Sequence, residues 1–245
     1  MKAVITAAGL GTRSGLDGKL RKEMLPVYDR RGGELVLRPM IDCIMHRLEN
    51  AGINGFVVVV DPEDKYTKEY IENEFDEVDF AYQREKKGFG DAVLKARPYV
   101  NGEPFILNAG DGMILPQEHI DMVVKTAVEN RDRNVLTLFR VPNPQRYGTA
   151  RVDRDGGRYR VTEVVEKSTT PPSSLALTAF YAFTRGILDF IDDRESNVEL
   201  TPAINRMILS GTYTIGIEID RPNWVSVGIA KEYADILRRT LRLVE

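Results

Sequence analysis

A short apolar run near the N-terminus of this chain ends at two closely spaced glycines. Ala3-Val4-Ile5 is followed by Ala7-Ala8-Gly9-Leu10-Gly11-Thr12-Arg13. This pattern predicts a buried strand whose carboxyl end presents backbone N–H groups to a ligand. Because glycine has no Cβ, the main chain can approach an anion and form a concave, partly positive nest. Four cations follow in the same stretch: Arg13, Lys19, Arg21 and Lys22. The stretch therefore predicts a phosphate site with mobile cations around it.

Two common phosphate motifs do not fit this loop. The dinucleotide-binding fingerprint needs a third glycine three residues after the second, and Ser14 occupies that place. A P-loop needs Gly-Lys followed by serine or threonine, and Gly18-Lys19 is followed by Leu20. The residues alone are also compatible with an ordinary glycine turn beside solvated charges.

A second motif in the same stretch narrows the interpretation. Lys22-Glu23-Met24-Leu25-Pro26 follows the glycine loop at a short distance. The pair AAGLGTR and KEMLP resembles the signature of the sugar-1-phosphate nucleotidyltransferases, also called sugar-nucleotide pyrophosphorylases. The resemblance implies two sets of residues: nucleotide-binding Ala8, Gly9, Gly11 and Thr12, and catalytic Arg13 and Lys22. The chain departs from the family at Arg21, where proline is usual.

A later stretch resembles the second signature of the family. Gln83 is followed five residues later by Gly88, the spacing with which the family reads a pyrimidine base. A side-chain amide can both donate to and accept from the imide edge of uracil or thymine. A helix start opened by glycine fits these residues equally well. Only the resemblance implies that Gln83 and Gly88 bind the nucleotide.

A carboxylate follows the next expected strand, at Asn108-Ala109-Gly110-Asp111-Gly112. The carboxyl edge of a parallel sheet is where α/β proteins bind ligands. The resemblance implies that Asp111 is catalytic and binds Mg²⁺, the expected cofactor, which would offset the negative charge of both reactants. The family typically has a second metal-binding aspartate where Ser226 stands, and a hydroxyl is a weaker ligand. Either Asp111 and the substrate phosphates suffice, or another acid substitutes, with Glu218 and Asp220 close upstream, or activity is reduced.

The last third of the chain resembles the sugar side of the family. Two alternating segments around Asp155-Gly156-Gly157 predict a hairpin, and Val164-Val165-Glu166-Lys167 resembles the motif VEKP. The resemblance implies a sugar-phosphate site made of Tyr147, Gly148, Glu166 and Lys167. Because neighbouring side chains of a strand alternate, the residues alone would place only one of Glu166 and Lys167 inside. Ala179 replaces a glycine that the family keeps against the sugar, which leaves the identity of the sugar open.

Apolar runs alternate with amphipathic segments along the chain. The continuous apolar run at 56–60 predicts a central parallel strand. Further core strands are expected at 104–107 and 135–141. The alternation predicts an α/β fold with a doubly wound, mainly parallel sheet. The resemblance makes the fold GT-A-like (Rossmann-like) with a small sugar-binding β lobe. Residues 1–245 are expected to form a single nucleotidyltransferase domain, with the sugar-side lobe roughly at 141–228.

Composition argues against several classes of protein. The formal net charge of −3 over 245 residues offers no broad basic face for nucleic acid. No apolar run approaches the ~20 residues that span a bilayer, and the N-terminus lacks a signal-peptide pattern, so a cytoplasmic protein without a membrane partner is expected. The single cysteine, Cys43, falls in the apolar stripe of an expected helix and is predicted to lie in the core. His46 and His119 have no cysteine or histidine at the sequence spacing of a zinc site, so a zinc site is not expected.

The resemblance implies an enzyme. The expected reaction is direct in-line attack of a sugar-1-phosphate on the α-phosphorus of a pyrimidine nucleoside triphosphate, which gives an NDP-sugar and pyrophosphate. UTP and glucose-1-phosphate are favoured, because KEMLP and the serine before Leu175-Ala176-Leu177 look closer to bacterial uridylyltransferases than to thymidylyltransferases. Alternatives are dTTP as the nucleotide, a different phosphorylated acceptor, and a regulatory homologue that binds nucleotide and turns over poorly. The sequence leaves a homo-oligomer open.

Overall fold

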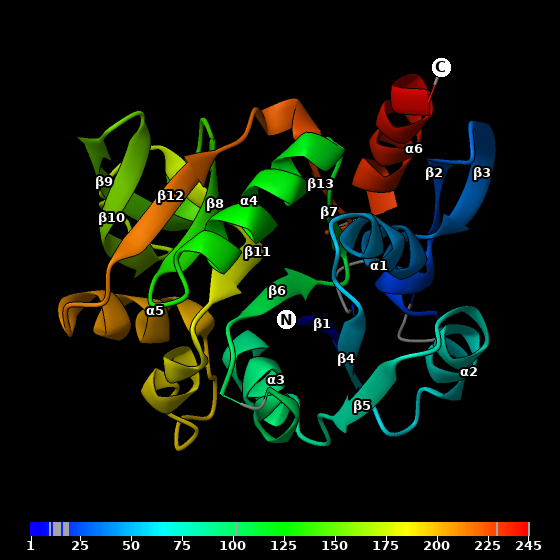
Figure 1. The fold of residues 1–245 in the computed structure, drawn as a ribbon, viewed down its shortest axis with the longest axis horizontal. Helices are drawn as coiled ribbons and strands as arrows, with labels where there is room; N and C mark the ends of the chain where they lie inside the picture. The colour runs from blue at the N-terminus through cyan, green and yellow to red at the C-terminus, as the bar shows by residue number, and fades with distance from the viewer. Residues whose placement is uncertain (10, 12–15, 17–19, 101, 229, 245) are drawn as a thin grey trace.

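A nine-stranded sheet forms the centre of the computed structural model, which describes residues 1–9, 11, 16, 20–100, 102–228 and 230–244 (Figure 1). In spatial order the strands are β5 (Val78–Tyr82), β4 (Gly55–Val60), β1 (Lys2–Ala7), β6 (Phe105–Ala109), β11 (Leu175–Phe183), β8 (Asn134–Arg140), β12 (Thr214–Glu218), β10 (Arg158–Glu166) and β9 (Gly148–Asp155). The apolar runs expected as central strands became β4, β6 and β8, so these expectations are confirmed.

The sheet is mixed, which corrects the expectation of a mainly parallel sheet. Strands β5, β4, β1 and β6 pair in parallel, and so do β8 and β12. In contrast, β11 is antiparallel to both β6 and β8, and β10 is antiparallel to both β12 and β9. The expected hairpin joins β9 to β10, and Gly156 and Gly157 in its turn have φ of 53° and 85°, a region that favours glycine.

Helices cover both faces of this sheet. They are α1 (Met40–Asn50), α2 (Lys65–Glu74), α3 (Phe89–Lys95), α4 (Gln117–Glu129), α5 (Leu200–Leu209) and α6 (Ala230–Val244). Ile5 of β1 belongs to the core cluster that contains side chains of α1 and α4, and the adjacent Val4 belongs to the cluster of α3 and α5. Strand β1 is therefore buried on both faces, as its continuous apolar run predicts. Cys43 lies buried in α1, as expected.

Two short two-stranded sheets complete the fold. One is the hairpin of β2 (Pro26–Arg31) and β3 (Glu34–Pro39), and the other pairs β7 (Gly112–Ile114) with β13 (Trp224–Ser226). Both Gly32 and Gly33 between β2 and β3 have positive φ, as a tight hairpin turn requires. In the described part of the chain, every helix is too short or too polar to cross a bilayer.

Candidate active site

A cavity of about 340 Å³ lies where β1, β5 and β6 end. Of the residues expected at the nucleotide and the metal, it is lined by Ala8, Gly9, Gly11, Lys22, Gln83, Gly88 and Asp111. The sheet brings these residues together from three separate stretches of sequence. Thr12 and Arg13 lie outside the described residues.

Lys22 and Asp111 form an ion pair in this cavity, between Lys22 Nζ and Asp111 Oδ2. Lys22 begins the 3-10 turn η1 (Lys22–Met24), and Asp111 follows β6. The side chains are 16% and 30% exposed, so a ligand in the cavity can reach both. The backbone of Asp111 is held by Val227, whose N–H donates to its carbonyl oxygen over 2.9 Å.

The turn that carries Asp111 is held by a buried amide and a glycine. Asn108 Nδ2 donates to the carbonyl oxygens of Ala109 (2.6 Å) and Gly112 (2.8 Å). A Cβ on Gly110 would lie 2.9 Å from the carbonyl oxygen of Thr6, which accepts the Gly110 N–H. The tight contact between this turn and β1 therefore places Asp111 beside the glycine loop.

Ser226 lies next to this turn, because β13 pairs with β7 and sets Ser226 opposite Gly112. Ser226 therefore lies near Asp111 in space. The resemblance expects a second metal-binding acid at this position, and the chain has a hydroxyl there. Glu218 is engaged elsewhere: Arg140 Nε lies 2.8 Å from Glu218 Oε1, and the Tyr159 hydroxyl donates to Glu218 Oε2 over 2.8 Å. Asp220 is exposed.

The amide of Gln83 is oriented by two acceptors. Gln83 Nε2 donates to the Gly88 carbonyl oxygen (3.0 Å) and to Asp91 Oδ2 (2.9 Å), and the residue is only 4% exposed. Since both amino hydrogens are used, Oε1 is the atom left for a ligand, and it can only accept. This narrows the expectation that the amide both donates to and accepts from a base.

Gly88 occupies a position that no other residue fits. Its φ is 117°, and a Cβ would lie 2.7 Å from the carbonyl oxygen of Val198 and 2.9 Å from Asn197 Oδ1. The segment before α5 therefore packs directly on the loop that ends at Gly88. The backbone conformation and the packing of this loop therefore require glycine, independently of any ligand.

Arg21 is not the mobile cation that the sequence suggests. Its Nη2 lies 3.1 Å from Asp61 Oδ2, its Nε lies 3.3 Å from Asp64 Oδ2, and its Nη1 donates to the carbonyl oxygen of Gly9 over 3.0 Å. Lys86 Nζ also pairs with Asp61 Oδ2, at 2.8 Å. Arg21 therefore ties the glycine loop to the segment after β4. Lys19 lies outside the described residues.

Glu23 is a cavity residue that the sequence did not single out. It is 3% exposed, and its Oε1 has no hydrogen-bond partner in the described part of the chain. Burial raises the pKa of Glu23 to about 8, and the nearby Asp111 carboxylate adds to this shift. At neutral pH the Glu23 carboxyl is therefore largely protonated and can donate a hydrogen bond into the cavity.

Replacing Glu23 by glutamine is expected to flatten the pH dependence of stability. Between the ordinary pKa of 4.5 and about 8, the folded chain holds a proton on Glu23 that the unfolded chain has released. The free energy of unfolding should therefore fall as pH rises through this window, by up to about 5 kcal/mol. Urea unfolding near pH 4.5 and near pH 8 measures the change. Equal slopes in the native chain and the variant would contradict the buried, protonated carboxyl.

A second cavity, of about 150 Å³, adjoins the first, since Phe89 lines both. Gly148 and Glu166 lie opposite each other on β9 and β10 and both line it. The Thr201 hydroxyl donates to Glu166 Oε2 over 2.6 Å, and a Cβ on Gly148 would lie 2.9 Å from the same oxygen. Glu166 is therefore a carboxylate fixed in the cavity wall, and Thr201 is a neighbour that the sequence analysis missed.

Lys167 joins Glu166 although the two are adjacent in sequence. Strand β10 ends at Glu166, and Lys167 has φ of 40°, so the alternation of a strand is broken there. Lys167 Nζ lies 2.9 Å from Glu166 Oε1, and its N–H donates to the carbonyl oxygen of Tyr147 over 3.1 Å. The ring of Tyr147 packs edge-on against Phe139 and lines a different cavity, which Ser226 also lines. The expected role of Tyr147 at the sugar stays a prediction.

Replacing Ala179 by glycine is expected to raise the free energy of unfolding by about 1 kcal/mol. Ala179 lines the Glu166 cavity with φ of 82°, where a Cβ is strained, at a register shift between Leu177 and Tyr181. Ala176→Gly in the same strand is the matched control, and it should lower the free energy of unfolding by about 1 kcal/mol. Denaturant unfolding measures both variants, and a loss in both would contradict strain at Ala179.

The sequence and the structure both resemble known nucleotidyl-transfer enzymes. The sequence model of the family described as "Nucleotidyl transferase" matches residues 2–242. The chain is 28% identical over 240 residues to the UTP–glucose-1-phosphate uridylyltransferase of Staphylococcus haemolyticus, covering 84% of this chain and 81% of that protein. It is 32% identical over 216 residues to the bifunctional protein GlmU of Methanococcus aeolicus, covering 85% of this chain and 47% of that protein.

The fold is shared with a solved structure of UDP-glucose pyrophosphorylase complexed with UDP-glucose. The TM-score is 0.84 at 20% sequence identity, and the match covers 98% of both chains. At this identity the likeness concerns the fold. Because the family model matches the chain almost from end to end, this protein is a member of the nucleotidyl transferase family.

Proposed function

We propose that this chain transfers the uridylyl group of UTP to glucose-1-phosphate and releases pyrophosphate. The observation that carries the proposal is the pair of adjoining cavities, one with Lys22 and Asp111 and the other with Glu166 in its wall. The name of the Staphylococcus haemolyticus relative supports these substrates. The proposal includes a GT-A-like fold and a single domain of residues 1–245, with a sugar-side lobe at about 141–228.

The acceptor character of Gln83 supports uracil or thymine over cytosine. The only atom of the Gln83 amide left for a ligand is Oε1, because its amino group donates to Gly88 and Asp91. Uracil and thymine carry an N–H at the imide position, and cytosine carries a lone pair there. An acceptor facing that position would bind the N–H of uracil or thymine and would repel the lone pair of cytosine. The choice of UTP over dTTP rests on the relatives and not on Gln83.

The donor set at Asp111 fits Mg²⁺, the proposed cofactor. Asp111 offers a hard carboxylate oxygen to the cavity, and the described residues hold no cluster of three or more acidic, histidine or cysteine side chains that would cage an ion alone. Mg²⁺ usually binds one or two carboxylates together with substrate phosphates and water. When bound, it would supply a positive charge that offsets the phosphate oxygens. Lys22 adds a second positive charge for the α-phosphate.

The remaining residues would act by positioning. Glu166 would accept hydrogen bonds from sugar hydroxyls, because Thr201 holds its carboxylate in place. Lys167, beside Glu166, would pair with the phosphate of the sugar. A phosphate oxygen of the sugar would then attack the α-phosphorus in line and displace pyrophosphate without a covalent intermediate.

A panel assay of pyrophosphate release tests this proposal. UTP, dTTP, CTP, ATP and GTP are each combined with several sugar-1-phosphates and Mg²⁺. The expected order is UTP with glucose-1-phosphate first, then dTTP, with CTP poor. CTP as good as UTP would contradict the acceptor role of Gln83. If UTP bound but no combination of substrates released pyrophosphate, this chain would instead be a regulatory homologue that binds nucleotide, as Ser226 suggests.

A further inference from the structure

The β2–β3 hairpin is a two-stranded sheet at the periphery of the molecule, with α6 beside β2 (Figure 1). The N–H of Tyr28 on β2 donates to Thr240 Oγ1 on α6 over 3.3 Å. In the described part of the chain, β3 pairs with β2 alone. The edge along β2 is therefore covered by a helix, whereas the edge along β3 has no strand beside it.

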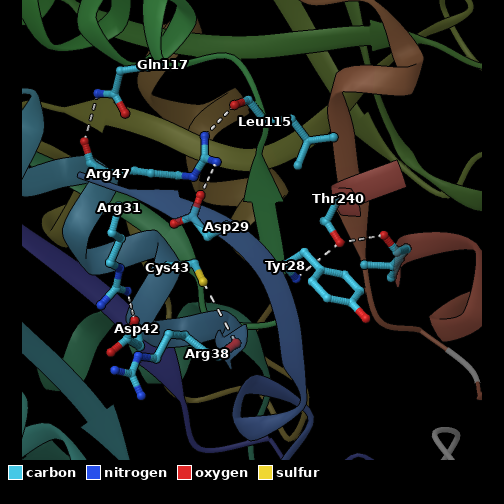
Figure 2. Close-up of polar contacts among 11 residues, drawn as sticks. Tyr28, Asp29, Arg31, Arg38, Asp42, Cys43, Arg47, Leu115, Gln117 and Thr240 are labelled. Carbon is cyan, nitrogen blue, oxygen red and sulfur yellow. Dashed lines mark hydrogen bonds and ion pairs between the residues drawn. The ribbon is translucent and has the colours of Figure 1, made fainter. Parts of the chain in front are cut away.

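Figure 2 shows two ion pairs that fix this hairpin on α1. Arg31 Nη2 contacts Asp42 Oδ1, and Asp42 is fully buried. Arg47 Nη2 lies 2.6 Å from Asp29 Oδ1, and Arg47 Nη1 donates to the carbonyl oxygen of Leu115. Breaking such pairs would leave buried charges poorly compensated, which is strongly unfavourable. The hairpin is therefore a fixed platform, and β3 keeps its orientation.

The direction of one hydrogen bond fixes which backbone groups of β3 face outward. Because the Tyr28 N–H points to α6, Tyr28 and the opposite Leu37 form a non-hydrogen-bonded pair. Such pairs alternate along an antiparallel ladder, so Leu35 and Leu37 both direct their N–H and C=O groups to the open edge. Their side chains are 53% and 51% exposed. An open edge with exposed leucines is a template for another strand.

We propose that β3 pairs with β3 of a second copy of this chain, antiparallel, about a two-fold axis at Val36. In this register Leu35 of each copy lies opposite Leu37 of the other, and their outward backbone groups complete a ladder. Glu34 then lies opposite Arg38 at both ends of the ladder, and both side chains are exposed in the single chain. The strand is therefore complementary to itself in charge, as a two-fold interface requires.

The order of the charges selects this register. A parallel pairing would set Glu34 against Glu34 and Arg38 against Arg38, and like charges directly opposite are destabilising. An antiparallel slip of two residues in one direction would place Pro39, which has no N–H, in the ladder. A slip in the other direction would pair Leu37 with Gly33, which belongs to the hairpin turn.

Cysteine cross-linking tests the register. In Val36→Cys the two thiols would face each other across the axis at the close spacing of a non-hydrogen-bonded pair, which suits a disulfide. The native Cys43 is buried. With an added oxidant, we expect a covalent dimer of twice 27.7 kDa on non-reducing electrophoresis. Leu35→Cys is the matched control, because residue 35 is not opposite itself, and it should give no covalent dimer. Equal cross-linking of both variants, or none with Val36→Cys, overturns the register.

Sedimentation velocity tests the dimer itself. The native chain should show a monomer–dimer equilibrium across about a hundredfold range of concentration. Leu37→Pro removes an outward N–H without removing a bond to β2, so this variant should be monomeric while it keeps the native unfolding temperature. A native chain that is monomeric at every concentration would overturn the proposal. Glu34 and Arg38 would then be charges that keep the open edge of β3 from pairing with another strand.

Exchanging the charges of Glu34 and Arg38 distinguishes the proposed β3–β3 contact from any other dimer contact. Glu34→Arg and Arg38→Glu each place like charges across the axis and should weaken the dimer about tenfold. An equal mixture of these two variants restores opposite charges at both ends, so it should associate as the native chain does. No weakening in either variant, or no recovery in the mixture, overturns the proposed pairing. These experiments measure association and do not depend on the proposed function.

Discussion

Replacing Asp111 by asparagine is expected to lower kcat for nucleotidyl transfer by about 10³-fold or more. The amide has nearly the shape of the carboxylate, but it loses the charge that pairs with Lys22 and that would bind Mg²⁺. The fold should survive, because the turn is held by Asn108 and by the backbone of Asp111. Initial rates of pyrophosphate release at saturating UTP and glucose-1-phosphate measure the loss.

Control variants test whether the loss of rate in Asp111→Asn comes from the missing charge in the cavity and not from a general effect on the fold. Asp121→Asn changes an exposed carboxylate on α4 and should keep the native rate. Lys22→Met should cost about as much as Asp111→Asn. The two changes together should cost little more than either alone, because under the proposal both groups would serve the same phosphates. Losses that multiply would contradict a shared role.

Replacing Glu166 by glutamine is expected to lower kcat/KM for glucose-1-phosphate by about 10²-fold, with UTP binding unchanged. Glu166 accepts a hydrogen bond from Thr201 and pairs with Lys167. Glutamine removes the charge that serves both contacts, so a sugar hydroxyl and the sugar phosphate would each lose an ordered partner. Rates at varied glucose-1-phosphate measure the effect, and calorimetry with UTP measures nucleotide binding.

Thr201→Val is the matched control for Glu166→Gln. It removes only the hydroxyl that orients the carboxylate, so kcat/KM for glucose-1-phosphate should fall about tenfold. UTP affinity should again stay unchanged. If Glu166→Gln weakened UTP binding as much as it weakened the use of glucose-1-phosphate, the Glu166 cavity would not be a separate sugar site.

The strands of the first half of the fold could be predicted from the sequence. The apolar runs at 3–5, 56–60 and 105–107 fall in β1, β4 and β6, because a strand buried on both faces must be apolar throughout. The glycine pair at 156–157 predicts the hairpin of β9 and β10, since a tight turn needs positive φ. The directions of β10 and β11 could not be predicted, because hydrophobic periodicity reports which faces are buried and not which strands pair.

Within the site, sequence spacing was informative where partners are close along the chain. Gln83 and Gly88 are five residues apart and bond to each other, so their motif is local. Arg21 pairs with Asp61, which lies far along the chain, and no local sequence pattern predicts that contact. The burial of Glu23 likewise involves a long-range contact, because Gly110 packs against its side chain. Because of its long-range contact, Arg21 is a structural residue and not the phosphate-binding cation that the sequence suggests.

Phosphorus NMR of the native chain with UTP, glucose-1-phosphate and Mg²⁺ follows the proposed reaction itself, because every substrate and product carries phosphorus. The proposed reaction predicts that UDP-glucose and pyrophosphate appear in equal amounts while both substrates disappear. Added pyrophosphatase should drive the conversion further, because it removes one product. Conversion of UTP to UDP and phosphate, or unchanged UTP despite its binding, would contradict nucleotidyl transfer by this site.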